Sequence, residues 1–88
     1  MPNYMITYDA PTGTDYQPFY DEIAKQDAAH LSLSVWLIST SSNAAQIRDW
    51  VKGLFGNRTS VAVVQINGNW ATFGVPEEAS NWLTRHLG

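Results

Sequence analysis

The sequence has no cysteine, few basic side chains and no long hydrophobic run. The lack of cysteine excludes a disulfide scaffold, a thiolate zinc site and a cysteine nucleophile. Eight Asp and Glu against five Lys and Arg give a net charge of −3, which argues against tight binding to long DNA, because such binders carry a dense basic face. The N-terminal apolar stretch lacks a basic flank and is too short for a membrane span, so we expect a cytoplasmic protein without membrane contact.

The residues that are present suffice for one compact domain. The chain has 88 residues, of which 44% are hydrophobic, and it includes four Trp, four Tyr and three Phe. We expect a single domain over residues 1–88, because this length leaves no room for a second core. A domain of this size buries only about 60% of the surface of its unfolded chain, so a partner subunit would add stability. Homodimerisation is therefore expected.

Periodicity and turn residues predict the order of the elements. Alternation predicts strands at 3–9 and 61–66, and one long strand or two short strands within 31–40. Apolar residues at helical spacing predict helices over 16–24, 43–55 and 76–86. The capping-box spacing occurs twice, at Thr14 with Gln17 and at Asn43 with Gln46. The pair Asn67-Gly68 is typical of a hairpin and predicts a short returning strand over 70–73.

This order predicts an α+β fold. With two strands in the centre it reads βαββαβ, the ferredoxin-like sandwich, followed by an extra short C-terminal strand and helix. In that arrangement two helices cover one face of an antiparallel sheet. We expect a second copy to cover the other face, with the extra strand and helix supplying the contact.

Asp9 is the first candidate site residue. It lies where the first strand ends before Ala10 and Pro11, at a position where an exposed carboxylate can face a metal ion or ligand. The alternative is that its side chain only organises a turn. One carboxylate is too few for Mg²⁺ or Mn²⁺ unless water, a phosphate or a second chain completes the shell, so a dimer that joins two copies of Asp9 would be needed.

The histidines and one tryptophan are the other candidates. His30 lies near the central strand and could act as a general base or contact a phosphate, although a solvated loop histidine is the alternative. His86 falls in the last turn of a predicted helix, where a structural role through the helix dipole is favoured over metal binding. Trp70 is the tryptophan expected to be exposed, and could pack in a dimer or stack on a base.

Tyr8-Asp9 at the end of the first strand, with Ser34-Val35-Trp36 in the centre, resembles the superfamily of the small CRISPR adaptation nuclease and virulence-associated protein D. The resemblance implies a ferredoxin-like homodimer, in which the first-strand Asp of each chain lies near the twofold axis and is linked to divalent-metal nuclease activity. It assigns catalytic roles to Asp9 and Ser34 and makes Asp9 the metal ligand. Where that pattern favours Arg and Gln, this sequence has His30 and Ser32.

Two functions from different classes follow. The first is a metal-dependent nuclease-like homodimer that hydrolyses RNA or DNA with Mg²⁺ or Mn²⁺ at paired Asp9 carboxylates, with His30 and Ser34 as further catalytic residues. The second is a non-enzymatic interaction module, such as an antitoxin-like protein or a phage-encoded inhibitor, that occupies the basic site of a protein partner. The resemblance favours the first, and the net charge of −3 favours the second.

Overall fold

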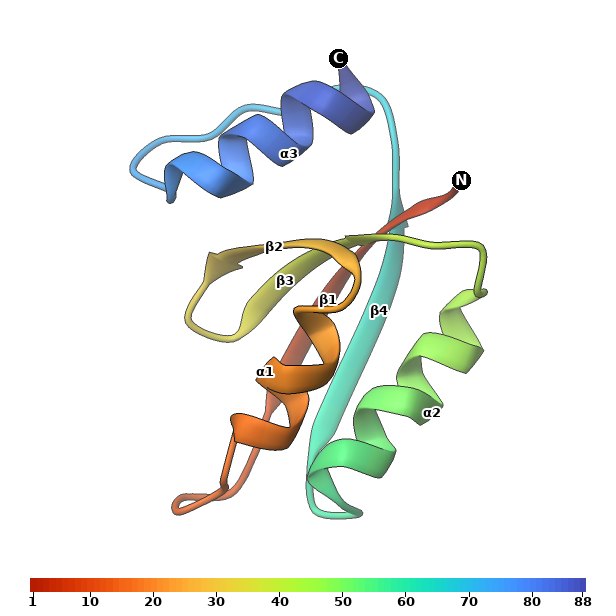
Figure 1. Cartoon of the computed structure of the whole chain (residues 1–88), viewed down its shortest axis with the longest axis vertical. Coiled ribbons are helices and arrows are strands. Elements are labelled where there is room, and N and C mark those ends of the chain that lie inside the picture. The colour runs from red at the N-terminus through yellow and green to blue at the C-terminus, as the bar shows by residue number, and fades with distance from the viewer.

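The computed structural model describes all residues from 1 to 88. Its elements follow the order βαββαβα (Figure 1). The strands are β1 (Asn3–Asp9), β2 (Asp27–Ser32), β3 (Val35–Ser39) and β4 (Ser60–Ile66), and the helices are α1 (Gln17–Ile23), α2 (Ala44–Phe55) and α3 (Glu77–Leu87). The expected α+β fold is thus confirmed. The centre has two strands that turn at Ser34, but the first begins at Asp27, before the predicted stretch of 31–40. No helix has the length and apolar character that a bilayer crossing requires.

The four strands form one sheet in the order β2-β3-β1-β4, and every neighbouring pair is antiparallel. β1 is central, and its Ile6 lies opposite Trp36 of β3 on one side and Val63 of β4 on the other. A register shift between His30 and Ser32 interrupts the pairing of β2 with β3. The two edges of the sheet are therefore β2, which is irregular, and β4, which pairs with β1 without a break.

One face of the sheet is covered by α1 and α2. Alternate residues of β1 point toward these helices because successive side chains of a strand face opposite sides. The cluster beneath the helices is the larger of two buried clusters, and Phe19 and Val51 in it are fully buried. Its buried members are Tyr4, Ile6, Tyr8, Phe19, Ile23, Ile38, Ile47 and Val51.

The opposite face is covered in part by α3, which packs against β2 and β3 (Figure 1). Its anchor is Trp82, which is 1% exposed and donates a hydrogen bond from Nε1 to the Asp27 carbonyl oxygen at 3.2 Å. Ala29, Leu37, Ala79, Trp82 and Leu83 are the buried members of this second cluster. The C-terminal helix was expected, but it covers its own sheet, so a second copy is not needed for that purpose.

The expected short strand at 70–73 is wrong. After β4 the chain turns at Gly68, whose φ is +76°, and reaches α3 without pairing with any strand. The physical reason is that Trp70, which is partly buried, packs on the apolar cluster beneath α3. The local Asn-Gly signal for a hairpin is therefore overridden by tertiary packing.

The two predicted capping boxes differ in outcome. At α2 the box is confirmed: Asn43 Oδ1 accepts from the Gln46 backbone N–H at 2.9 Å, and Gln46 Oε1 accepts from the Asn43 N–H at 2.8 Å. At α1 it is wrong, because Thr14 instead donates to the Pro11 carbonyl at 2.6 Å. α1 has no side-chain cap at Tyr16, the residue before its first turn.

Candidate functional site

Asp9 is exposed at the end of β1, opposite Ser60 of β4. It lines a shallow cavity of about 230 Å³ together with Thr7, Tyr8, Ser60, Val61 and Ala62. Its carboxylate makes no ion pair, and it belongs to no group of three or more side chains that could hold a metal ion. Within one chain Asp9 is therefore a single open carboxylate, and a metal ion there would need ligands from water, substrate or a second chain.

His30 lies on the other side of the sheet from Asp9. Its ring stacks on Trp36, with centroids 4.3 Å apart and planes at 10°, and Tyr20 of α1 lies 6.1 Å away. The one polar contact of the imidazole is Nε2 with the Leu33 carbonyl oxygen at 3.4 Å. Asp9 follows Tyr8, which points into the α1 and α2 core, so the Asp9 side chain points to the opposite face. These two predicted site residues are not brought together.

Ser34 is linked to Tyr8, the residue before Asp9, by a backbone hydrogen bond. It lies in the turn between β2 and β3, and its carbonyl oxygen accepts from the Tyr8 backbone N–H at 3.2 Å. The hairpin turn and the end of β1 therefore share one end of the sheet. This places Ser34 and Asp9 at neighbouring positions without a contact between their side chains, and it leaves His30 stacked farther along the hairpin.

Tyr8, to which the sequence assigned no functional role, has a hydroxyl with a shifted pKa. Burial raises the pKa of its hydroxyl from 10 to about 12, while the nearby Trp36 N–H works in the opposite direction. The side chain is 5% exposed, and neither Tyr8 Oη nor Trp36 Nε1 makes a hydrogen bond of good geometry. The hydroxyl stays neutral at physiological pH, so it is unsuited to act as a base.

His86 is held against the sheet. Its Nε2 lies 2.8 Å from Asp27 Oδ2, which is close enough for an ion pair when the ring is protonated, although the alignment is not that of a hydrogen bond. Arg85 Nη2 donates to Asp27 Oδ1 at 2.9 Å. These contacts join α3 to the start of β2 and agree with the structural role that the sequence favours for His86.

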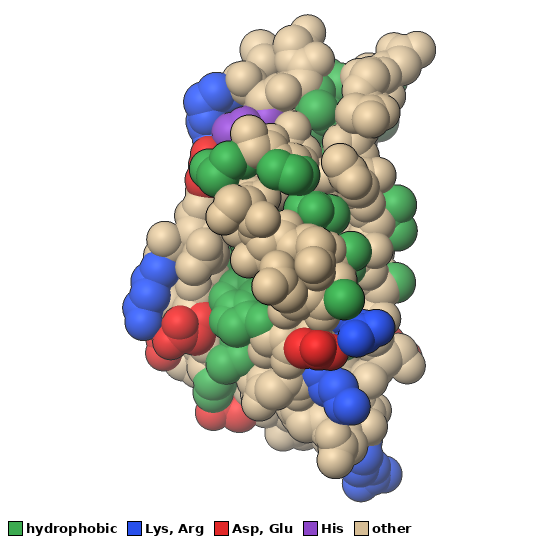
Figure 2. Space-filling model, turned by 90° about the vertical axis from the view of Figure 1, so that its right-hand side faces the viewer, with side chains coloured by type: hydrophobic (Ala, Val, Ile, Leu, Met, Phe, Trp, Pro, Cys, Tyr) green, Lys and Arg blue, Asp and Glu red, His purple; other side chains and the backbone are tan.

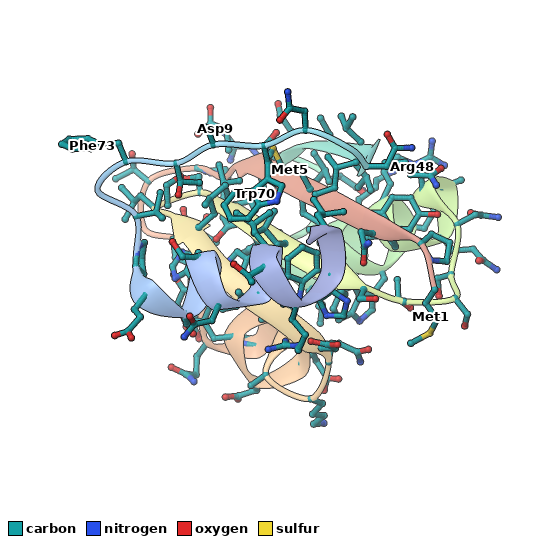
Figure 3. All side chains as sticks on the ribbon, turned by 90° about the horizontal axis from the view of Figure 1, so that it is seen from above. Met1, Met5, Asp9, Arg48, Trp70 and Phe73 are labelled. Atoms are coloured by element: carbon teal, nitrogen blue, oxygen red, sulfur yellow. The ribbon has the colours of Figure 1, made fainter.

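A second feature is an apolar cavity of about 370 Å³ between α3, the sheet and the segment that follows β4. We call it the α3 cavity. Its walls carry no charged side chain, and Trp70 and Met5 lie close together beside α3 in Figure 3. Its apolar lining consists of Met5, Leu31, Leu37, Ile66, Trp70, Ala71, Leu83 and Leu87, and its polar lining of Gln65, Asn67, Asn69 and Thr72.

The chain from Ser60 to Pro76 contains no Asp, Glu, Lys, Arg or His. We call it the uncharged segment; it comprises β4 and the connection to α3. Two large hydrophobic side chains are exposed on it, Val64 at 56% and Phe73 at 100%. Phe73 points away from the body of the molecule in Figure 3. Trp70, the aromatic expected to be exposed, is only partly so, and sequence periodicity gave no sign that Phe73 would be.

No family model and no solved structure matches this chain. The resemblance to the CRISPR adaptation and virulence-associated protein D superfamily therefore stays a prediction. The chain has two candidate regions, the open carboxylate of Asp9 and the uncharged segment with the α3 cavity.

Proposed function

We propose that the chain is a non-enzymatic, homodimeric protein-interaction module with a ferredoxin-like fold. The strand order β2-β3-β1-β4 with all pairs antiparallel supports the ferredoxin-like assignment. The observation that carries the function is the uncharged segment with its exposed Val64 and Phe73. Interface cores are depleted in charge and enriched in aromatic side chains, and this part of the surface has that composition.

The charges on the rest of the surface support an interaction module that binds a basic site of a protein partner. Three ion pairs join Lys25 with Glu22, Arg48 with Asp49, and Arg85 with Asp27. Since the chain has eight acidic and five Lys or Arg side chains, 8 − 3 = 5 carboxylates and 5 − 3 = 2 cations are left without such a pair. On the face drawn in Figure 2 the charged side chains gather in the lower part and along the left margin. A dimer built on the uncharged segment keeps these carboxylates free for a partner with a basic site.

The test is the mass of the purified chain in solution by light scattering over a wide range of concentrations. One chain has a mass of 9.8 kDa, so a dimer has 2 × 9.8 = 19.6 kDa. We expect the larger value, and we expect the double variant Val64→Lys with Phe73→Ser to be monomeric, because it puts a charge and a hydroxyl where the interface would be dry. A wild-type mass of one chain at every concentration would contradict the proposal.

A second function is a metal-dependent nuclease, and the observation that favours it is the unpaired Asp9 carboxylate beside a cavity of about 230 Å³. In this mechanism two copies of Asp9 from a dimer would hold Mg²⁺ or Mn²⁺, and the metal ion would supply an activated water for hydrolysis of a phosphodiester. The test is cleavage of RNA and DNA with each metal by the wild type and by Asp9→Asn. Activity that disappears in Asp9→Asn would replace the interaction module with this function.

A further inference from the structure

The structure contains two features that fit each other and that do not meet within the folded chain. The first is the side chain of Phe73, which is fully exposed and so contacts nothing in its own chain. The second is the α3 cavity, an apolar space of about 370 Å³. An engineered apolar cavity of about 150 Å³ takes up benzene and stays free of water, so the α3 cavity has room for a phenyl ring. The chain thus carries both a hydrophobic knob and a hole that admits it.

We propose that Phe73 of each chain inserts into the α3 cavity of a second copy. This inference rests on the proposed dimer and specifies its contact. A twofold axis makes the exchange reciprocal, because in such a dimer the same surface serves on both subunits. The ring would contact Trp70, Leu87 and their apolar neighbours in the cavity wall, where aromatic pairs contribute beyond the area that they bury.

Charge supports a second copy as the occupant. Each chain has a net charge of −3, so repulsion between two copies is smallest when the surfaces that meet are free of carboxylates. The cavity walls and the uncharged segment meet this condition, since neither has a charged side chain. The first acidic residue beyond the segment is Glu77, at the start of α3. A foreign partner is not required, because the chain itself supplies the group that fits.

Two glycines bracket the part of the connection that ends in Phe73. Gly74 next to it and Gly68 at the start of the connection have φ of +75° and +76°, a region that other residues rarely adopt. Between them Asn69 to Thr72 form part of the cavity wall. The connection therefore lines its own cavity and holds the next side chain outward, which is the geometry that a reciprocal exchange needs.

The experiment is a complementation test by light scattering. Phe73→Ser lacks the knob, and Leu87→Lys puts a charge in the hole. The homodimer of either variant lacks both reciprocal contacts. Losing one central aromatic contact already weakens a dimer about tenfold, so we expect each variant to dimerise at least tenfold more weakly than the wild type. In a mixture, Phe73 of the Leu87→Lys chain can enter the intact cavity of the Phe73→Ser chain. We expect the mixture to form heterodimers that restore one of the two contacts.

The controls separate this contact from folding and from dimerisation in general. Leu33 is 86% exposed and lies in the turn between β2 and β3, so Leu33→Ser removes a comparable hydrophobic side chain and should leave the dimer unchanged. Phe73→Trp should retain it. If Leu87→Lys does not fold, Asn69→Lys provides a charge at the exposed rim of the same cavity.

Three results would overturn the inference. A Phe73→Ser chain that dimerises as tightly as the wild type would show that the module dimerises by another surface, and the proposed function would survive. If the wild type is a dimer but the mixture of Phe73→Ser and Leu87→Lys chains associates no more than each variant alone, the dimer likewise forms by another surface. A wild type that is monomeric throughout would overturn both proposals, and would be the result if Phe73 closed over its own cavity.

Discussion

The two faces of the sheet are packed in different ways. Under α1 and α2 the side chains are large and interlocked: Phe19 alone lies within 6.3 Å, between ring centroids, of Tyr8, Trp36, Trp50 and Phe55. Under α3 the layer is thinner and leaves a cavity of about 370 Å³ beside an uncharged connection. The first face contains the larger buried cluster, and the second borders open apolar volume. We therefore expect the first face to contribute most of the stability, and the proposed dimer contact uses the second face.

The largest loss of stability is expected from a substitution in the core beneath α1 and α2. Phe19→Ala removes a fully buried ring and should destabilise the fold by about 3 to 5 kcal/mol, because it leaves a cavity in a closely packed core. For a domain of this size each kcal/mol lowers the melting temperature by roughly 4 to 8 °C. Thermal unfolding followed by circular dichroism checks this.

The matched control for Phe19 is Phe73. Because its ring is fully exposed, Phe73→Ser should change the free energy of unfolding by less than about 0.5 kcal/mol when measured at a concentration too low for dimers. Equal losses of stability for the two phenylalanines would show that the contrast between the faces is wrong.

The next effect concerns the second face. Leu83 is 5% exposed and lines the α3 cavity, so Leu83→Ala should cost about 3 kcal/mol, toward the lower part of the usual range, because the side chain already borders an open space. Amide exchange should then speed up in α3 more than in α2. Uniform acceleration over both helices would mean that the two faces unfold as one unit.

A third effect uses the buried Tyr8 hydroxyl. Its folded pKa of about 12 lies above the ordinary 10, so the folded state binds more protons between these values and stability falls as the pH rises through this window. The difference of two pKa units corresponds to a loss of about 3 kcal/mol, which begins near pH 10 and is complete only above pH 12. Urea unfolding at a series of pH values measures the slope.

Tyr8→Phe removes the hydroxyl and keeps the aromatic ring, so it isolates the contribution of the hydroxyl to stability. The hydroxyl has no hydrogen-bond partner, so its removal should leave stability at pH 7 unchanged or raise it by about 1 kcal/mol, and should reduce the decline between pH 10 and 12. An unchanged alkaline decline in Tyr8→Phe would assign it to another group.

Local patterns predicted the elements that local interactions stabilise. The alternation of Asn3–Asp9 and the capping box of Asn43 with Gln46 were visible because both depend on residues near one another in the chain. The path after Asn67 was not, because the position of Trp70 is decided by packing against α3 and the sheet. The separation of Asp9 from His30 likewise depends on strand register and on an irregularity in β2, which involve distant residues.

The smallest effect tests how α3 is held over the second face. Asp27 contacts Arg85 and His86 through its carboxylate, while its carbonyl oxygen accepts the hydrogen bond from Trp82. Asp27→Asn removes the charge and keeps the carbonyl, so only the ion pairs are lost. Since the Arg85 side chain is 57% exposed and the Asp27 side chain 41%, screening by solvent limits the loss to below about 1 kcal/mol.

Salt and a second variant make this small effect interpretable. The difference in stability between the wild type and Asp27→Asn should shrink in 1 M NaCl, because exposed ion pairs are screened at high ionic strength. Asp21→Asn is the control, since Asp21 accepts a hydrogen bond only from Gln17 of the same helix. If Asp27→Asn instead cost several kcal/mol and exposed the α3 cavity, the ion pairs rather than Trp82 would hold α3 on the sheet, and release of that helix would become a means of opening the second face.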